Sequence, residues 1–235
     1  VIAAGAIIIR TIMETLGQQS VLVSDLGLRE GVLINLAITS SAKGSMSEDL
    51  PANLGKVLNE WFEVSNLLQK DIQNLVNAYQ DDWSSQPFRR MFVRSGWALI
   101  EGEVFCLKQL ALRACELGGE ILSADERTFL SEVEMVADEK GRIWQRDVHE
   151  GSLENLKRAL KIATSKFELE WTPDFGNQGW EQLRRSRDLR DRITHPKTAA
   201  ELAISDDELD FQRTGFAWFL ETILKFQTIF QEKYQ

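Results

Sequence analysis

The sequence contains few of the residues that carry thiol and metal chemistry, with two cysteines and two histidines among 235 residues. Cys106 and Cys115 fall in one predicted helix, where nine residues of rise separate them by about 13 Å, too far for a disulfide. This pattern is typical of reduced, buried thiols in a cytosolic protein. His149 has no metal-ligand spacing to another histidine or to a cysteine. We therefore predict no metal site and no cofactor.

Long apolar runs and positive charge are also scarce. The opening stretch, VIAAGAIIIR, is too short to span a bilayer and lacks the basic start and small-residue cleavage site of a signal peptide. We expect a cytoplasmic protein with no membrane partner. The net charge of -9 argues against sequence-independent binding to nucleic acid but leaves room for a local basic patch. The first residue is a valine, which suggests a piece of a longer protein.

The residues that are present are sufficient for a well-packed core. The hydrophobic fraction is 43% and the charged fraction 27%, which is ordinary for a globular protein. Seven tryptophans and 12 phenylalanines supply large apolar side chains. The length fits one large domain or two small ones.

Residues 1–38 are predicted to form a helix, a short strand and a second helix. Gly17 closes the first, apolar helix, and VLVSD is a short β-branched run. A single strand has no partner for its backbone groups, so this piece looks severed from a sheet. The stretches VIAAGAIIIRTIMETLG, VLVSD and DLGLREGVLINL resemble the end of the actin-like domain of the exopolyphosphatase / guanosine pentaphosphate phosphatase family. The phosphate-binding loops and catalytic carboxylate of that family lie upstream of the resembling stretch, so no catalytic residue is carried over.

Residues 39–50, TSSAKGSMSEDL, are small and polar and predict a linker. From residue 51 to residue 235 the sequence predicts helices throughout, so the expected fold class is mainly α, a bundle of about six helices. Pro87 suits the first turn of the second long helix of this bundle. Gly96 and Gly102 within that helix predict the close approach of a neighbouring helix.

Capping signals mark where several of these helices begin or end. Ser123 and Glu126 have the spacing of a capping box, and so do Ser205 and Glu208, which open the last helix. Pro196 ends the helix GWEQLRRSRDLRDRIT, because a residue that precedes proline avoids the helical region.

A motif at the end of that helix, RDLRDRITHP at residues 187–196, combines arginines with one of the two histidines. Arg190, Asp191 and His195 fit the pattern R-D-x3-H. This pattern resembles the R-x4-6-H motif of HEPN domains, all-helical modules that include many metal-independent ribonucleases. The resemblance implies a catalytic site at these three residues, formed across a homodimer. One branch of that family often has a tyrosine two places after the histidine, where this chain has Lys197.

The chemistry of RNA cleavage without a metal needs the same residue types. Histidine has a pKa near neutrality, so His195 is a candidate base for the 2′-hydroxyl proton. Arginine remains charged and offers a planar fork, so Arg190 is a candidate for stabilising the charge that builds up on phosphorus oxygens. Asp191 is then a candidate for orienting either of them.

A second group of charged residues lies on the helix that begins near Pro87. Arg90, Arg94, Glu101 and Lys108 follow one line of this helix, at offsets of four, eleven and eighteen residues. Together with Arg187, we take Arg90, Arg94 and Glu101 as candidate binding residues that line the same cleft as the motif. The alternative is a solvated helix face whose ion pairs contribute little.

The motif also has a plain structural interpretation. Basic and acidic residues alternate along this helix, as in an exposed helix covered with salt bridges. Positive charge at a helix C-terminus is favourable in its own right. His195, just before Pro196, would then only cap the last carbonyl groups.

The last helix is apolar around more than one face, with six phenylalanine or tryptophan side chains between residues 211 and 230. Such a helix is either central in the bundle or buries its second face in a partner, and the second alternative favours a homodimer.

Three functional hypotheses remain open. The first is a metal-independent endoribonuclease of a stress or defence system, with His195 as base and Arg190 as phosphate stabiliser. The second is a non-catalytic helical module that binds RNA, a nucleotide or an antitoxin-like protein. The third is an interaction module appended to an exopolyphosphatase-family protein.

Overall fold

The computed structural model of the protein describes residues 52–79, 82–140, 142–148 and 150–234. The chain divides into two units between Glu48 and Asp49, and all the described residues lie in the second unit. The predictions made for residues 1–38, for the linker at 39–50 and for His149 therefore lie outside the described residues.

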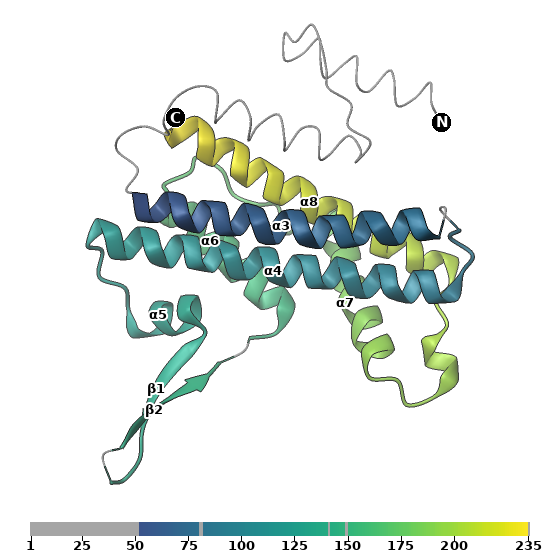
Figure 1. The fold of residues 1–235 in the computed structure, drawn as a ribbon, viewed down its shortest axis with the longest axis horizontal. Coiled ribbons are helices and arrows are strands. Elements are labelled where there is room, and N and C mark those ends of the chain that lie inside the picture. Colours follow the sequence, from purple (N-terminus) through teal and green to yellow (C-terminus); the bar gives the residue numbers. More distant parts are fainter. Residues whose placement is uncertain (1–51, 80–81, 141, 149, 235) are drawn as a thin grey trace, which may run out of the picture. The chain divides into compact units, whose positions relative to one another are not determined.

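The described residues form a mainly α fold, as predicted (Figure 1). Six α-helices, one 3-10 helix and one β-hairpin follow each other along this part of the chain. Their bounds are α3 Ala52–Ala78, α4 Gln86–Gly118, α5 Ala124–Ser131, β1 Val133–Ala137, β2 Ile143–Asp147, α6 Ser152–Lys166, α7 Gln178–Thr194, η1 Ala199–Leu202 and α8 Asp206–Tyr234. None of the helices in the described ranges has the length and apolar character needed to cross a membrane.

Both predicted capping boxes are confirmed. The Ser123 hydroxyl accepts the backbone N–H of Glu126 (3.1 Å), and the Glu126 carboxylate accepts the backbone N–H of Ser123 (3.0 Å). Ser205 and Glu208 exchange the same two hydrogen bonds, at 3.2 and 2.9 Å, where α8 begins. These bonds satisfy backbone donors that have no partner within the helix.

Helix α4 is the centre of the bundle and contacts α3, α5, α6, α7 and α8. Its two internal glycines lie at close approaches, as predicted. A Cβ atom on Gly102 would lie 2.7 Å from Leu68 of α3, and one on Gly96 would lie 3.1 Å from Gln212 of α8. A third close approach joins α8 to α7, because a Cβ on Gly215 would lie 2.5 Å from the backbone nitrogen of Leu183.

Helix α8 is a core helix in this structure. Phe216, Phe219, Phe226 and Phe230 are all buried, whereas Leu224 is 39% exposed. The apolar character of α8 on more than one face is therefore explained mostly by packing within the bundle.

One buried carboxyl group lies between α3 and α4. Glu103 is 2% exposed, and its two carboxylate oxygens accept hydrogen bonds from Trp61 Nε1 and Ser65 Oγ. Burial raises the pKa of Glu103, because the charged form is disfavoured away from water, and the two hydrogen bonds oppose this effect.

The two cysteines are free and buried, as predicted. Burial is the main cause that raises the pKa of each thiol to about 11. Both are therefore protonated and unreactive at neutral pH.

The prediction of helices throughout residues 51–235 is wrong at residues 133–147, which form the antiparallel β1–β2 hairpin. Figure 1 shows this hairpin projecting away from the helices. The sequence conceals it because apolar side chains occur on both of its faces, with Val136 and Trp144 on one and Met135 and Ile143 on the other. A half-buried strand would instead show one apolar and one polar face.

Candidate functional site at the end of α7

The packing of α7 fixes the direction in which its charged residues point. Leu183 and Ile193 are fully buried, so the residues on the opposite side face outward. On the buried side, Ser186 Oγ accepts a hydrogen bond from Trp97 Nε1 of α4 (2.9 Å) and donates one to the side-chain oxygen of Gln212 in α8. This buried chain of hydrogen bonds holds α7 against two other helices.

Arg190 lies at the centre of a cluster of charged side chains where α7 meets α4. Its guanidinium group forms an ion pair with Glu101 of α4 and a second one with Asp191 Oδ1 at 2.9 Å. Asp191 also pairs with Arg187 at 3.0 Å, through its other oxygen. The guanidinium lies 5.8 Å from the ring centre of Trp97. The structure thus brings together four predicted residues: Arg187, Arg190, Asp191 and Glu101.

The guanidinium groups of Arg90 and Arg94 donate hydrogen bonds to backbone carbonyl groups. Arg94 Nη2 donates to the carbonyl oxygen of Ile193 at 2.6 Å, and Arg90 Nη1 donates to that of Leu202 at 3.2 Å. The carbonyl of Ile193 is one of the last in α7 and has no partner within the helix. These two predicted binding residues therefore anchor the end of α7 and η1 to α4.

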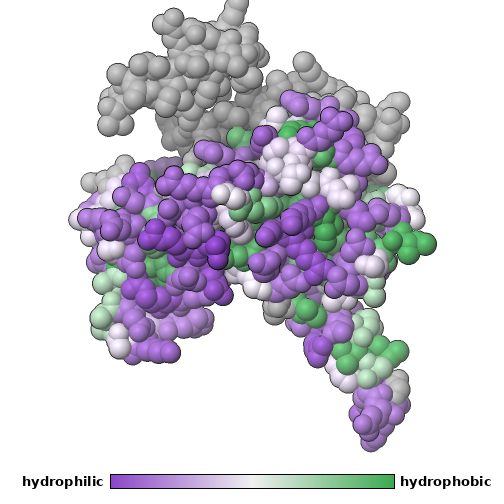
Figure 2. Space-filling view, turned by 180° about the vertical axis from the view of Figure 1, so that it is seen from behind, coloured by the Kyte–Doolittle hydropathy of each residue, from purple (hydrophilic) through white to green (hydrophobic). Residues whose placement is uncertain are grey.

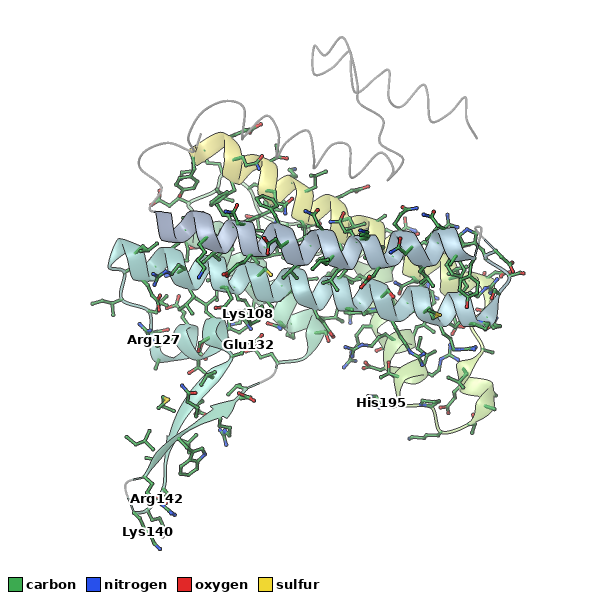
Figure 3. The ribbon with its side chains drawn as sticks, in the orientation of Figure 1. Lys108, Arg127, Glu132, Lys140, Arg142 and His195 are labelled. Carbon is green, nitrogen blue, oxygen red and sulfur yellow. The ribbon has the colours of Figure 1, made fainter. Side chains whose placement is uncertain are left out.

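His195 ends α7 and leaves its side chain exposed. Its backbone N–H donates to the carbonyl oxygen of Asp191 at 3.0 Å, but its φ of -123° departs from the helix. Figure 3 shows the imidazole on the loop that follows α7. Among the described residues no hydrogen bond or ion pair engages this ring, and none joins it to Arg190.

Lys108, at the far end of the predicted charged line, is buried rather than solvated. Its ammonium group pairs with Glu132 (2.8 Å), donates to Asn155 (3.0 Å) and lies 4.1 Å from the ring centre of Phe129. Figure 3 shows Lys108 and Glu132 pointing toward each other. Burial lowers the pKa of Lys108, and the hydrogen bond to Glu132 opposes this effect.

The four residues of the charged line on α4 all contact other elements, although Arg94 and Glu101 also remain exposed. Arg90 contacts η1, Arg94 and Glu101 contact α7, and Lys108 contacts Glu132. They tie α4 to η1, to α7 and to the end of α5.

A cavity of about 300 Å³ opens beside this line, between α4 and the start of α6. Its lining residues are Ile100, Glu101, Val104, Phe105, Glu132, Glu150, Ser152 and Asn155. Glu101 belongs both to this cavity and to the Arg190 cluster, and Ser152 Oγ lies 3.3 Å from its carboxylate. Its three carboxylates are paired with Arg190, Lys108 and Arg158, and no arginine or lysine is among the described residues that line the cavity itself, so it does not favour a phosphate.

Arg187 also pairs with Asp188 at 3.2 Å, so the Arg190 cluster contains two arginines and three carboxylates. A phosphate that binds Arg190 must therefore displace Glu101, whereas Asp191 can remain and hold the guanidinium in place. Asp191 contacts Arg190 in this geometry, and its role in orienting one of the two motif residues stays a prediction.

The sequence missed the partners of Lys108. Asn155 lies in the first turn of α6, and nothing in its own segment indicates that Lys108 is its neighbour. Glu132 has a φ of 58°, in the left-handed region that closes α5. No sequence pattern marks this conformation for a glutamate, because glycine or asparagine usually occupies it.

No protein family, curated protein or solved structure that was compared matches this chain. Within the described ranges, no group of three or more histidine, cysteine, aspartate or glutamate side chains is arranged to hold a metal ion.

Proposed function

We propose that this protein is a HEPN-like helical module that acts on RNA at the end of α7. Arg190 contacts the phosphate, Asp191 positions Arg190, and His195 accepts the proton of the 2′-hydroxyl. The observation that carries the proposal is the Arg190–Asp191 ion pair (2.9 Å), one turn before an exposed histidine whose ring has no partner among the described residues.

The different roles proposed for Arg190 and His195 follow from the surroundings of each side chain. Arg190 is partly exposed and fixed by two carboxylates, which suits a group that must remain charged and oriented. His195 is exposed, so its ring is accessible to a ligand. A second copy of the chain would supply the opposite half of the site, as the HEPN resemblance implies.

A non-catalytic binding module is the second candidate, and one observation favours it. Glu101 forms an ion pair with the guanidinium of Arg190 and neutralises its charge. An RNA or protein ligand that displaces Glu101 would bind here without any need for His195.

The experiment is cleavage of single-stranded RNA by the purified full chain in excess EDTA. We expect cleavage to survive chelation and to be lost in His195→Ala and in Arg190→Ala. Arg184→Ala is the matched arginine control, because Arg184 lies on the exposed side of α7 and forms an ion pair with Glu181 of the same helix. His149→Ala is the histidine control.

Each result has a definite meaning. Loss in the two motif variants, with both controls active, supports a ribonuclease. Binding of RNA without cleavage, abolished by Arg190→Ala alone, supports the binding module. If a folded wild-type chain neither binds nor cleaves RNA, the ribonuclease and the RNA-binding module are both overturned, and only a protein ligand is left for the second candidate.

A further inference from the structure

The β1–β2 hairpin exposes three large apolar side chains. Met135 is 61% exposed, Ile143 67% and Trp144 46%. Figure 2 shows hydrophobic side chains gathered on the projecting hairpin. A two-stranded hairpin is marginally stable by itself, and a third strand or a packing partner usually completes it.

Strand β2 is the more open of the two edges. All five of its residues are exposed, whereas three of the five in β1 are partly buried. Hydrogen bonds at both ends of the ladder, Asp138 N–H to Arg142 (3.0 Å) and Val148 N–H to Glu132 (2.9 Å), show that even-numbered residues face the partner strand. Because this alternation holds along an antiparallel pair, the N–H and C=O groups of residues 143, 145 and 147 point outward from the free edge of β2.

We propose that β2 pairs with β2 of a second copy of this chain, antiparallel, with the two-fold axis passing through Gln145. The four strands then run in the order β1–β2–β2–β1 across the two subunits. In this register Gln145 exchanges two backbone hydrogen bonds with Gln145 of the partner subunit. Ile143 and Asp147 exchange bonds with Asp147 and Ile143 of the partner subunit, so every outward backbone group of β2 is satisfied.

The side chains complement each other in the same register. Trp144 lies opposite Arg146 of the partner subunit, and the symmetry repeats this pair. The pair occupies a position without backbone hydrogen bonds, where opposing side chains come closest. A guanidinium over an indole ring is a favourable cation–π arrangement. Arg146 already pairs with Glu134 on the same face, so the glutamate holds the arginine in position.

Neighbouring registers are disfavoured by charge. A shift that centres the axis on Trp144 places Arg142 opposite Arg146 of the partner subunit, twice. A shift to Arg146 places that residue opposite its own copy. Only the Gln145 register pairs all five residues of β2 without like charges.

This inference does not rest on the proposed function. It concerns β1 and β2, whereas the RNA site lies on α7, so a second copy that completes the RNA site would bind through a separate interface, and the two proposals are tested by different readouts.

The first test is the mass of the full chain in solution, by sedimentation velocity over a range of concentrations. We expect a dimer, and we expect Gln145→Pro to raise its dissociation constant by about tenfold or more, because proline removes both hydrogen-bond donors at the axis. Gln145→Ala keeps the backbone N–H and is the matched control, with a dissociation constant near that of the wild type. The outward N–H of Gln145 is not used by β1, so the hairpin itself tolerates the proline.

The second test locates the axis. Gln145→Cys places two cysteines about 5.5 Å apart at Cα, within reach of a disulfide. We expect mild oxidation to produce a cross-linked dimer, while Met135→Cys on the other strand remains uncross-linked. The native Cys106 and Cys115 are buried and do not compete.

The proposal is overturned by a wild-type chain that remains monomeric at every concentration. It is also overturned by a dimer that Gln145→Pro does not weaken, which would place the interface elsewhere. If circular dichroism shows that Gln145→Pro loses helical structure, the cross-link decides: equal cross-linking of the Gln145→Cys and Met135→Cys chains rejects the register.

Discussion

The helical bundle and the β1–β2 hairpin contain similar apolar residues, but the bundle buries them and the hairpin leaves them exposed. In the bundle, Leu107, Leu110 and Phe219 are fully buried. In the hairpin, Ile143 and Trp144 remain largely exposed. The difference lies in the neighbours, because every bundle helix packs against another helix, whereas each hairpin strand has one partner and one free edge. The apolar surface of the hairpin has no packing partner among the described residues, and this observation is the basis of the pairing proposed for β2.

The largest effect is expected where the bundle is tightest. Gly215→Ala places a Cβ 2.5 Å from the backbone nitrogen of Leu183, and a backbone atom cannot relieve the clash by a change of rotamer. We expect a loss of about 3 kcal/mol in the free energy of unfolding, measured by urea denaturation. Gly118→Ala is the control, because nothing lies within 4 Å of its Cβ. That change should be neutral or stabilise by up to about 1 kcal/mol. Equal effects of the two substitutions would contradict the close packing of α7 and α8.

The next effect is expected at Lys108, where the bundle meets the base of the hairpin. Lys108→Ala leaves Glu132 and Asn155 without their cationic partner, and we expect a loss of about 2–3 kcal/mol. Arg113→Ala removes an exposed pair with Glu116 from the same helix and should cost about 0.5 kcal/mol or less. Urea denaturation of both variants gives the comparison. A similar loss in the two would mean that the burial of Lys108 contributes nothing.

Glu103 provides a test by pH. Its pKa is raised in the folded protein, so the unfolded chain releases its proton at lower pH, and stability is lost as pH rises through the raised pKa. Glu103→Gln carries no charge and lacks this loss. We expect the stability of the Glu103→Gln chain relative to the wild type to increase as pH rises above the usual glutamate range. Thermal melts at several pH values measure this difference, and a constant difference would refute the role of burial.

The smallest effect is expected on the hairpin face. Met135→Gln changes a residue that is 61% exposed, so the free energy of unfolding should change by no more than about 0.5 kcal/mol. Urea denaturation at low protein concentration measures the chain without the contribution of association. A loss comparable to that of Gly215→Ala would mean that this side chain supports the bundle.

The sequence predicts the helices well because their signals are local. Ser123 with Glu126, and Ser205 with Glu208, mark two helix starts that the structure has in the same places. The hairpin has a weaker signal, because a short glycine-containing stretch, DEKGR at residues 138–142, separates two runs whose apolar side chains occur on both faces. A capping box can be recognised from four consecutive residues. The exposure of a strand depends on how the rest of the chain packs, so it cannot be recognised locally.

In the candidate site, too, local contacts can be predicted from the sequence and long-range contacts cannot. The Arg190–Asp191 pair joins adjacent residues and is visible in the motif. The Glu101–Arg190 pair joins residues 89 positions apart, and only the line of charges on α4 hinted at it. The burial of Lys108 and Glu103 depends on α3, α5 and α6 and could not be inferred from their own segments.

The most direct test of the α7 site is a double-mutant cycle on RNA affinity. Each chain carries His195→Ala to prevent cleavage, and the probe is an end-labelled single-stranded RNA followed by fluorescence anisotropy. We predict that Glu101→Gln tightens binding, that Arg190→Ala weakens it by about tenfold, and that Glu101→Gln has no effect once Arg190 is alanine. Equal tightening by Glu101→Gln with and without Arg190 would show that Glu101 acts only through its charge, and would contradict an RNA phosphate bound at Arg190.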